Sequence, residues 1–218
     1  MATKGSSTFW GAELLGYARE RLLRARVLLL AAAVALCSGA ASASRDAAVW
    51  TQAVAAAVGL VWAFRLWDDL ADLAYDRIHH PERKLVSSTT RPSFAAALGI
   101  VLAAAVGALV LAERPRQALA LGLLCAFLAA VYLPWRGRVD RRLMRAHLVL
   151  AKYPVFIYVA AVRPVSTTVA MIAGAAYLAL CVIEILDDPA LRRTVAARVV
   201  ATAEAVAFVG IVAAGALR

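Results

Sequence analysis

The chain has 218 residues, of which 63% are hydrophobic, and its formal net charge at neutral pH is +10. Soluble domains are about half apolar, so the mean hydropathy of +0.75 excludes an ordinary water-soluble fold and indicates lipid as the solvent. The positive charge does not indicate binding to nucleic acid, because no basic face with interleaved aromatic residues accompanies it. We expect the Lys and Arg residues to lie in loops beside anionic lipid.

The N-terminal part is polar and is followed by the first apolar run. We predict that residues 1–25 form a partly helical cytoplasmic segment and that 26–43 is the first membrane helix. Arg24 and Arg26 before this run, and Ala41-Ser42-Ala43 at its end, also resemble a signal peptide with its cleavage site. The polar stretch is long for a signal peptide, so we expect an uncleaved helix.

Six further apolar stretches follow, each close to the roughly 20 residues that a helix needs to span a bilayer. We therefore predict an all-α, polytopic membrane bundle of seven helices, forming one domain over residues 1–218. The six further ranges are 48–67, 94–112, 117–134, 145–162, 167–186 and 197–216.

The basic residues are distributed unevenly between the two sides of this bundle. Most lie in the N-terminal segment and in the loops after the second, fourth and sixth helices. The other side carries Arg45, Arg114, Arg116, Arg163 and Arg218. Because Lys and Arg are enriched in cytoplasmic loops, we predict a cytoplasmic N-terminus, with the ends of the second and sixth helices on that same side.

Four aspartates lie within nine residues at the inner end of the second helix. They are Asp68, Asp69, Asp72 and Asp76. On a continuing helix they share an arc of about 100°. Clustered carboxylates repel one another and are costly to desolvate unless a cation bridges them, and hard oxygen ligands suit Mg²⁺. The alternative is a solvated helix end whose acids pair with nearby arginines. Those arginines are Arg65, Arg77 and Arg83.

A second acidic cluster ends the sixth helix and consists of Glu184, Asp187 and Asp188. These residues also lie within about 100° on a helix. The alternative is a helix end that Pro189 closes, with neighbouring arginines compensating the charge. Because both clusters face the same membrane side, they are predicted to hold Mg²⁺ around a diphosphate and to stabilise its developing charge.

The acidic motifs resemble those of the UbiA prenyltransferase superfamily. Its first motif reads N/D-D-x-x-D-x-x-x-D, followed by R-x-x-x-P-x-R. The matching residues here are Asp68, Asp69, Asp72, Asp76, Arg77, Pro81 and Arg83. The second motif, D-x-x-D-x-x-x-D, is matched by Glu184 and Asp187, whereas Leu191 holds the third position and Asp188 is a shifted substitute. The run from Tyr132 to Arg138 resembles the Tyr-plus-basic segment of the family.

The resemblance implies a helical bundle with a central cavity and Mg²⁺-dependent transfer of a prenyl group from a prenyl diphosphate to a lipophilic, often aromatic, acceptor. Both acidic clusters become metal ligands in this interpretation. The residues implied to contact the diphosphate are Arg77, Arg83, Tyr132, Arg136 and Lys152. The family usually has more spans than the seven predicted here. A terpene cyclase of the same family and a non-catalytic scaffold that binds a lipid diphosphate remain alternatives.

Several isolated polar residues lie within the predicted helices. Lys152 is predicted either to reach the diphosphate or to pair with Glu204 of the last helix. Glu204 is expected to be a helix-pairing partner, and His147 a packed or interfacial residue. The cysteines are expected to be small apolar fillers. They are Cys37, Cys125 and Cys181. The arginines after the fourth helix either clamp phosphate or anchor the chain to lipid. Besides Arg136, they are Arg138, Arg141, Arg142 and Arg145.

Overall fold

The computed structural model describes residues 6–132, 142–162 and 166–216, and within these ranges the chain is helical with no strand. This confirms the all-α prediction. The helices are α1 (Ser6–Tyr17), η1 (Ala18–Leu22), α2 (Ala25–Ala41), α3 (Ala47–Ala71), α4 (Leu73–His79), α5 (Lys84–Ser87), α6 (Arg91–Leu111), α7 (Pro115–Phe127), η2 (Leu128–Tyr132), α9 (Arg142–Leu150), α10 (Lys152–Ala160), α11 (Thr167–Asp187), α12 (Pro189–Arg192) and α13 (Val195–Ala216).

Five helices of the described chain are long and apolar enough to cross a membrane. They are Ala47–Ala71, Arg91–Leu111, Leu143–Ala160 (α9 and α10 together), Thr167–Asp187 and Val195–Ala216. A sixth candidate is the pair Gly11–Leu22 and Ala25–Ala41, whose two halves are bent by 77°. Several long apolar helices thus indicate an integral membrane protein.

All seven predicted ranges overlap helices, but a count of seven spans is not confirmed. The helix α2 has 17 residues and reaches spanning length only together with the helix before the bend. The apolar helix Pro115–Ala130, in the fourth range, is also shorter than a full span. At a rise of about 1.5 Å per residue, neither helix alone crosses a hydrocarbon core of about 30 Å.

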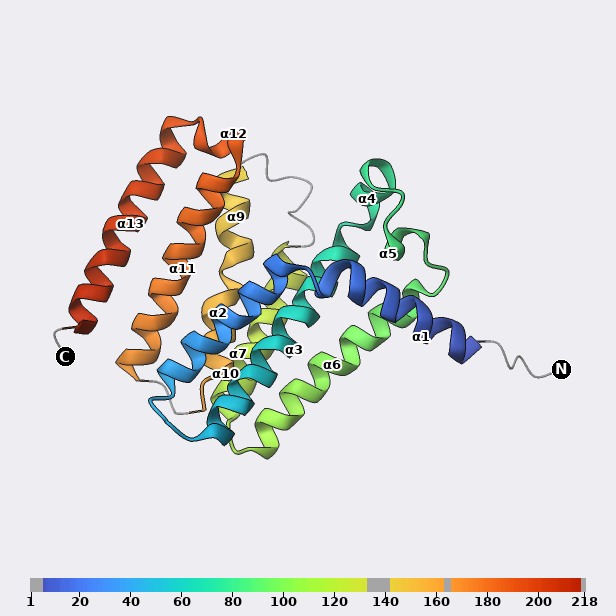
Figure 1. Ribbon diagram of the computed structural model, residues 1–218, viewed down its shortest axis with the longest axis horizontal. Coiled ribbons are helices and arrows are strands. Elements are labelled where there is room, and N and C mark those ends of the chain that lie inside the picture. Colours follow the sequence, from blue (N-terminus) through green and yellow to red (C-terminus); the bar gives the residue numbers. More distant parts are fainter. Residues whose placement is uncertain (1–5, 133–141, 163–165, 217–218) are drawn as a thin grey trace.

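The helix α10 lies at the centre of the bundle and packs against α2, α3, α7 and α11 (Figure 1). Its Phe156 and Ile157 are almost completely buried, and the Phe156 ring lies 4.8 Å from that of Phe64 on α3. In lipid, such helices associate through van der Waals packing and close approach of small residues. Gly39 of α2 shows this requirement, because a Cβ at that position would overlap the ring of Trp50 on α3.

The C-terminal end of α10 is fixed by two polar side chains from the start of α7. Arg114 donates to the carbonyl oxygens of Val159 and Ala161, and Gln117 Nε2 donates to that of Ala161 at 2.8 Å. These bonds satisfy carbonyls that the helix itself leaves unpaired. Burial lowers the pKa of the Arg114 guanidinium, but arginine remains protonated at neutral pH.

The N-terminal segment, predicted to be polar and partly helical, is a helix that docks on the bundle. Tyr17 is 1% exposed and meets Phe94 of α6 edge-on, with ring centroids 5.6 Å apart. Glu13 accepts hydrogen bonds of 2.5 Å from the hydroxyls of Ser88 and Thr90. These contacts bring the following η1, with Arg21, beside the acidic end of α3.

The helix α13 packs mainly against α11 and α12, at the opposite end of the molecule from α1 (Figure 1). Many of its apolar side chains are exposed, as expected for a lipid-facing helix. They include Val199, Val206, Val209 and Val212.

Candidate functional site

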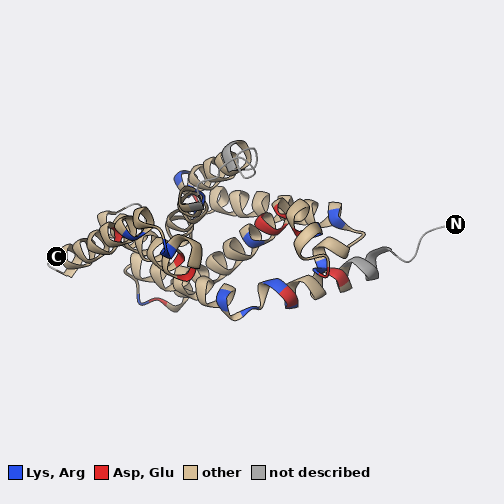
Figure 2. Cartoon of the chain, turned by 90° about the horizontal axis from the view of Figure 1, so that it is seen from above, with Lys and Arg blue, Asp and Glu red and all other residues tan. Residues whose placement is uncertain are grey.

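A polar pocket of about 780 Å³ lies where the ends of α3 and α11 meet α4, α9 and α12. Most of its lining is charged. The charged lining residues are Arg21, Arg65, Asp68, Asp72, Asp76, Arg83, Arg145, Lys152, Glu184 and Asp188. The elements α4 and α12 lie at the same end of the bundle, and acidic and basic segments lie side by side when that end is viewed from above (Figures 1 and 2). Both predicted acidic clusters therefore contribute to one pocket.

Three of the four aspartates of the first cluster line this pocket: Asp68, Asp72 and Asp76. The predicted continuous helix is interrupted here, because α3 ends at Ala71 and α4 begins at Leu73. Helical hydrogen bonds nevertheless cross the junction, from Asp72 N to Asp68 O at 2.9 Å and from Asp76 N to Asp72 O at 2.8 Å. The four-residue spacing therefore still presents these acids on one side.

Asp69 lies apart from the pocket lining and joins the N-terminal segment to α3. Its carboxylate accepts hydrogen bonds from Tyr17 Oη at 3.0 Å, from Arg21 Nε and Nη2 at 2.9 and 2.6 Å, and from Arg65 Nη2 at 2.9 Å. The Asp69 side chain is 5% exposed. This bidentate arrangement holds two guanidinium groups at the edge of the pocket.

We predict that Asp69→Asn lowers the free energy of unfolding by about 3–5 kcal/mol, because it removes the charge that pairs two arginines in a buried network. Tyr17→Phe, which removes one hydrogen bond to the same carboxylate, should cost about 1.5–3 kcal/mol. Unfolding of the purified protein in detergent measures both values. If Asp69→Asn were as stable as the wild type but no longer released diphosphate, Asp69 would instead be a metal ligand, as predicted from the sequence.

The second cluster is also divided by the structure. Glu184 and Asp188 line the pocket, whereas Asp187 is outside it, with its side chain 63% exposed and 3.3 Å from Arg26. Asp188 ends α11 and caps α12, accepting from Ala190 N at 2.8 Å. The backbone turns at this residue, since its ψ angle is 109°.

Beyond this turn lies Leu191, four residues after Asp187. This residue belongs to α12 and is 6% exposed, packed in a cluster with Ile185, Ala197 and Ala201. Leu191 also lines the pocket. An apolar side chain thus occupies the place where the resemblance implies a third acid.

Two of the five Lys and Arg residues that line this pocket, called the acidic pocket below for its two carboxylate clusters, form close ion pairs with its aspartates. Lys152 Nζ is 2.5 Å from Asp68 Oδ2, and Arg83 Nη1 is 2.5 Å from Asp76 Oδ2. The alternative pairing of Lys152 with Glu204 is wrong, because Lys152 joins α10 to α3 and Glu204 contacts His147 instead. The pairs Arg65–Asp69 and Arg83–Asp76 agree with the alternative interpretation of the first cluster, in which its acids pair with nearby arginines.

The other residues predicted to contact the phosphate are Arg77, Tyr132 and Arg136, and the described part of the chain places none of them in the pocket lining. Arg77 is exposed and is not among the residues that line the pocket. Arg136 lies outside the described residues, and so does the side chain of Tyr132. Of the arginines after the fourth helix, Arg145 lines the pocket. Arg21 also lines it and was not singled out from the sequence, because no local pattern connects it to aspartates 48 residues away.

Comparisons with known proteins assign no family to the chain: no family model, no curated protein and no solved structure matches it.

The donor set of the pocket fits divalent cations with a bound anion. Carboxylates from two helices supply the hard oxygen ligands that Mg²⁺ prefers, and this ion shares its coordination sphere with phosphates and water. Arginine and lysine in the same pocket can neutralise the remaining phosphate oxygens. The lining also includes apolar and aromatic side chains, namely those of Ala146, Val149, Leu150 and Tyr153. A ligand with a charged head and an apolar tail matches this mixed lining.

Proposed function

We propose that the chain is a Mg²⁺-dependent intramembrane prenyltransferase, which transfers a prenyl group from a prenyl diphosphate to a lipophilic acceptor such as an aromatic lipid. One observation carries this proposal: acids at the ends of α3 and α11, more than 100 residues apart in the sequence, line one pocket that also contains cations. The resemblance of the Asp68–Arg83 segment to the UbiA superfamily points to the same reaction class.

The reaction needs the diphosphate to be held and its departure stabilised. Bound Mg²⁺ would neutralise the charge that develops on the leaving diphosphate. We assign its binding to the pocket acids Asp68, Asp72, Asp76, Glu184 and Asp188. Arg83, Arg145 and Lys152 would bind phosphate oxygens, after Lys152 and Arg83 exchange part of their present pairing with aspartate for the substrate.

The apolar side chains that line the pocket, such as Val149 and Leu150, would contact the prenyl chain. Cleavage of the allylic C–O bond leaves its electron pair on the diphosphate and a carbocation on the prenyl group. The electron pair of the acceptor then forms the new bond, and the acceptor loses a proton. Tyr153, whose ring meets that of Phe156 at a centroid distance of 5.4 Å, would shield the cation from water with an aromatic face.

The uneven distribution of Lys and Arg supports an orientation with the pocket and the N-terminus on the cytoplasmic side. This orientation requires seven spans, counting the bent pair and the shorter helix Pro115–Ala130 as one span each. Prenyl diphosphates would then enter from the cytoplasm with their chains in lipid.

A second candidate function is a non-catalytic scaffold that binds a lipid diphosphate. Two observations favour it: Lys152 and Arg83 already pair with aspartates of the first cluster, and Leu191 stands in the place of the third acid of the second motif. Both features reduce the number of carboxylates that can bind metal ions.

The experiment is diphosphate release by the purified, detergent-solubilised protein from geranyl, farnesyl and geranylgeranyl diphosphates, with Mg²⁺ or EDTA and with or without aromatic lipid acceptors. We expect Mg²⁺-dependent release with a prenylated acceptor as the organic product. A cyclic hydrocarbon or alcohol formed without acceptor would identify a cyclase instead. Binding without release from any donor and acceptor pair, in folded protein, would favour the scaffold.

A further inference from the structure

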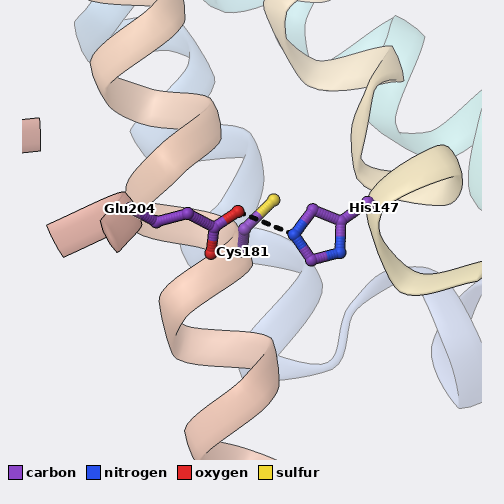
Figure 3. Close-up of side chains that lie close together, drawn as sticks. All are labelled: His147, Cys181 and Glu204. Carbon is purple, nitrogen blue, oxygen red and sulfur yellow. Dashed lines mark hydrogen bonds and ion pairs between the residues drawn. The ribbon is translucent and has the colours of Figure 1, made fainter. Parts of the chain in front are cut away.

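A second group of metal-ligating side chains lies away from the acidic pocket, between α9, α11 and α13 (Figure 3). His147, Cys181 and Glu204 each offer a ligand atom, and these atoms all lie within 4.8 Å of one another. Figure 3 shows the three side chains converging from three helices. Cys181 is completely buried, and the side chain of Glu204 is 11% exposed. A thiol, an imidazole and a carboxylate thus meet between three helices.

The two ring nitrogens of His147 face different acceptors. Its Nδ1 lies 2.8 Å from the carbonyl oxygen of Leu143, which can only accept, so Nδ1 carries a proton. Its Nε2 lies 2.6 Å from Glu204 Oε1. In neutral imidazole this nitrogen presents a lone pair to a carboxylate oxygen, so two acceptors face each other. Either a proton or a metal ion must lie between the two groups.

Two further observations favour the metal ion. Glu204 Oε2 is buried and has no hydrogen-bond partner of ordinary geometry within the described part of the chain, with only the weak thiol donor of Cys181 close to the carboxylate; a buried carboxylate oxygen without a strong partner is costly. The carbonyl that receives Nδ1–H is the kind of outer partner that orients metal-bound histidines. The hydroxyl of Tyr177 adds a bond of 3.3 Å to the His147 carbonyl and holds the backbone of α9 at this point.

We propose that His147 Nε2, Cys181 Sγ and a Glu204 oxygen bind a zinc ion. Zn²⁺ accepts nitrogen, thiolate and carboxylate ligands in tetrahedral geometry, at about 2.0–2.3 Å. Those bond lengths require ligand atoms about 3.4 Å apart, so Nε2 and Oε1 separate by less than about 1 Å on binding. Binding releases two protons to solvent: the thiol proton of Cys181 and the proton that lies between Nε2 and Oε1 in the metal-free protein. The fourth position is taken by Glu204 Oε2 or by water.

The zinc ion would attach α13 to the rest of the bundle. This helix packs mainly against α11 and α12, and only 6% of the residues in its most apolar stretch are buried. A ligand from each of α9, α11 and α13 would hold all three at one level. The proposal is independent of prenyl transfer, because none of the three ligands is among the residues that line the acidic pocket.

The test uses the full chain in detergent, stripped with a chelator and titrated with Co²⁺ and then Zn²⁺. Cobalt on thiolate and imidazole in a tetrahedral site gives visible d–d bands and a near-ultraviolet charge-transfer band from sulfur. We expect both bands at one Co²⁺ per chain, their loss on addition of Zn²⁺, and a higher unfolding temperature with Zn²⁺ than without it.

The cysteines supply matched variants. Cys181→Ser should remove the charge-transfer band and weaken Zn²⁺ binding by more than about 100-fold, beyond the loss typical of outer-shell changes. His147→Gln should weaken it similarly. Cys37→Ser and Cys125→Ser, which alter half-buried thiols elsewhere, should bind as the wild type does.

Two results would overturn the proposal. One is a cobalt complex of the wild-type protein that lacks the charge-transfer band from sulfur. This measurement does not depend on whether the ligand variants fold. The other is equal zinc affinity in wild type and Cys181→Ser. In either case the cluster is a buried His147–Glu204 ion pair beside an inert thiol.

Discussion

Asp72→Asn is expected to lower Mg²⁺-dependent diphosphate release by about 100- to 1,000-fold, the range that follows the loss of one charge-stabilising group in an active site. Asp72 lies at the junction of α3 and α4 and lines the acidic pocket. Asparagine keeps the shape of the side chain and removes its charge, so the loss reports on metal and diphosphate binding. Steady-state release of inorganic diphosphate from the preferred prenyl donor measures the effect.

Asp188→Asn on the facing helix should give a loss of similar size. Asparagine caps a helix as well as aspartate does, so the bond to Ala190 N is preserved and the start of α12 remains intact. If both acids bind the same metal–diphosphate complex, the double variant should lose far less than the product of the single losses.

Glu82→Gln is the control for these two variants. Glu82 follows the first cluster, its side chain is 72% exposed, and it is not among the residues that line the pocket. Its release rate should stay within about twofold of the wild-type rate, as expected of a surface substitution with little effect on stability. If Asp72→Asn released diphosphate at the wild-type rate, the first acidic cluster would not be part of the proposed site.

The ion pair between Lys152 and Asp68 gives the second large effect, this time on stability. Lys152 is 3% exposed and its Nζ lies 2.5 Å from Asp68 Oδ2. Asp68→Asn leaves a buried ammonium without its partner and should cost about 3–5 kcal/mol of unfolding free energy. Lys152→Met leaves the Asp68 carboxylate beside other acids, so we expect a loss of comparable size.

The double variant Lys152→Met/Asp68→Asn should recover most of this stability, because no charge is then left unpaired. It should not recover diphosphate release, since both groups are assigned to the substrate complex. Unfolding by denaturant in mixed micelles yields the coupling energy. The exposed pair of Arg26 and Asp187 is the matched control, with an expected coupling below about 1 kcal/mol. Strictly additive losses at Lys152 and Asp68 would contradict the pairing.

Part of the acidic pocket could be predicted from local spacing alone. Asp68, Asp72 and Asp76 recur at four-residue intervals, and a helical backbone keeps such residues on one side even across the break between α3 and α4. Glu184 and Asp188 have the same spacing. The position of both clusters at helix ends then followed from the apolar runs before them.

The remaining features depend on contacts between distant segments. Asp69 differs from its neighbours because Tyr17 and Arg21 approach it from the docked N-terminal segment. The number of spans depends on the bend of 77° before α2, which hydropathy does not reveal. Glu204 was expected to pair between helices and His147 to be packed or interfacial; that both meet Cys181 follows only from the arrangement of α9, α11 and α13.

The central claim is that the pocket between α3 and α11 binds a prenyl diphosphate through Mg²⁺. The most direct measurement is equilibrium binding of a non-hydrolysable farnesyl thiodiphosphate to the purified protein, with Mg²⁺ or EDTA, because it requires neither the acceptor nor turnover. We predict saturable binding that needs Mg²⁺, persists in Glu82→Gln, and is lost in Asp72→Asn and Asp188→Asn. Binding that is indifferent to EDTA and to both substitutions, or no binding to folded wild-type protein, would contradict the claim.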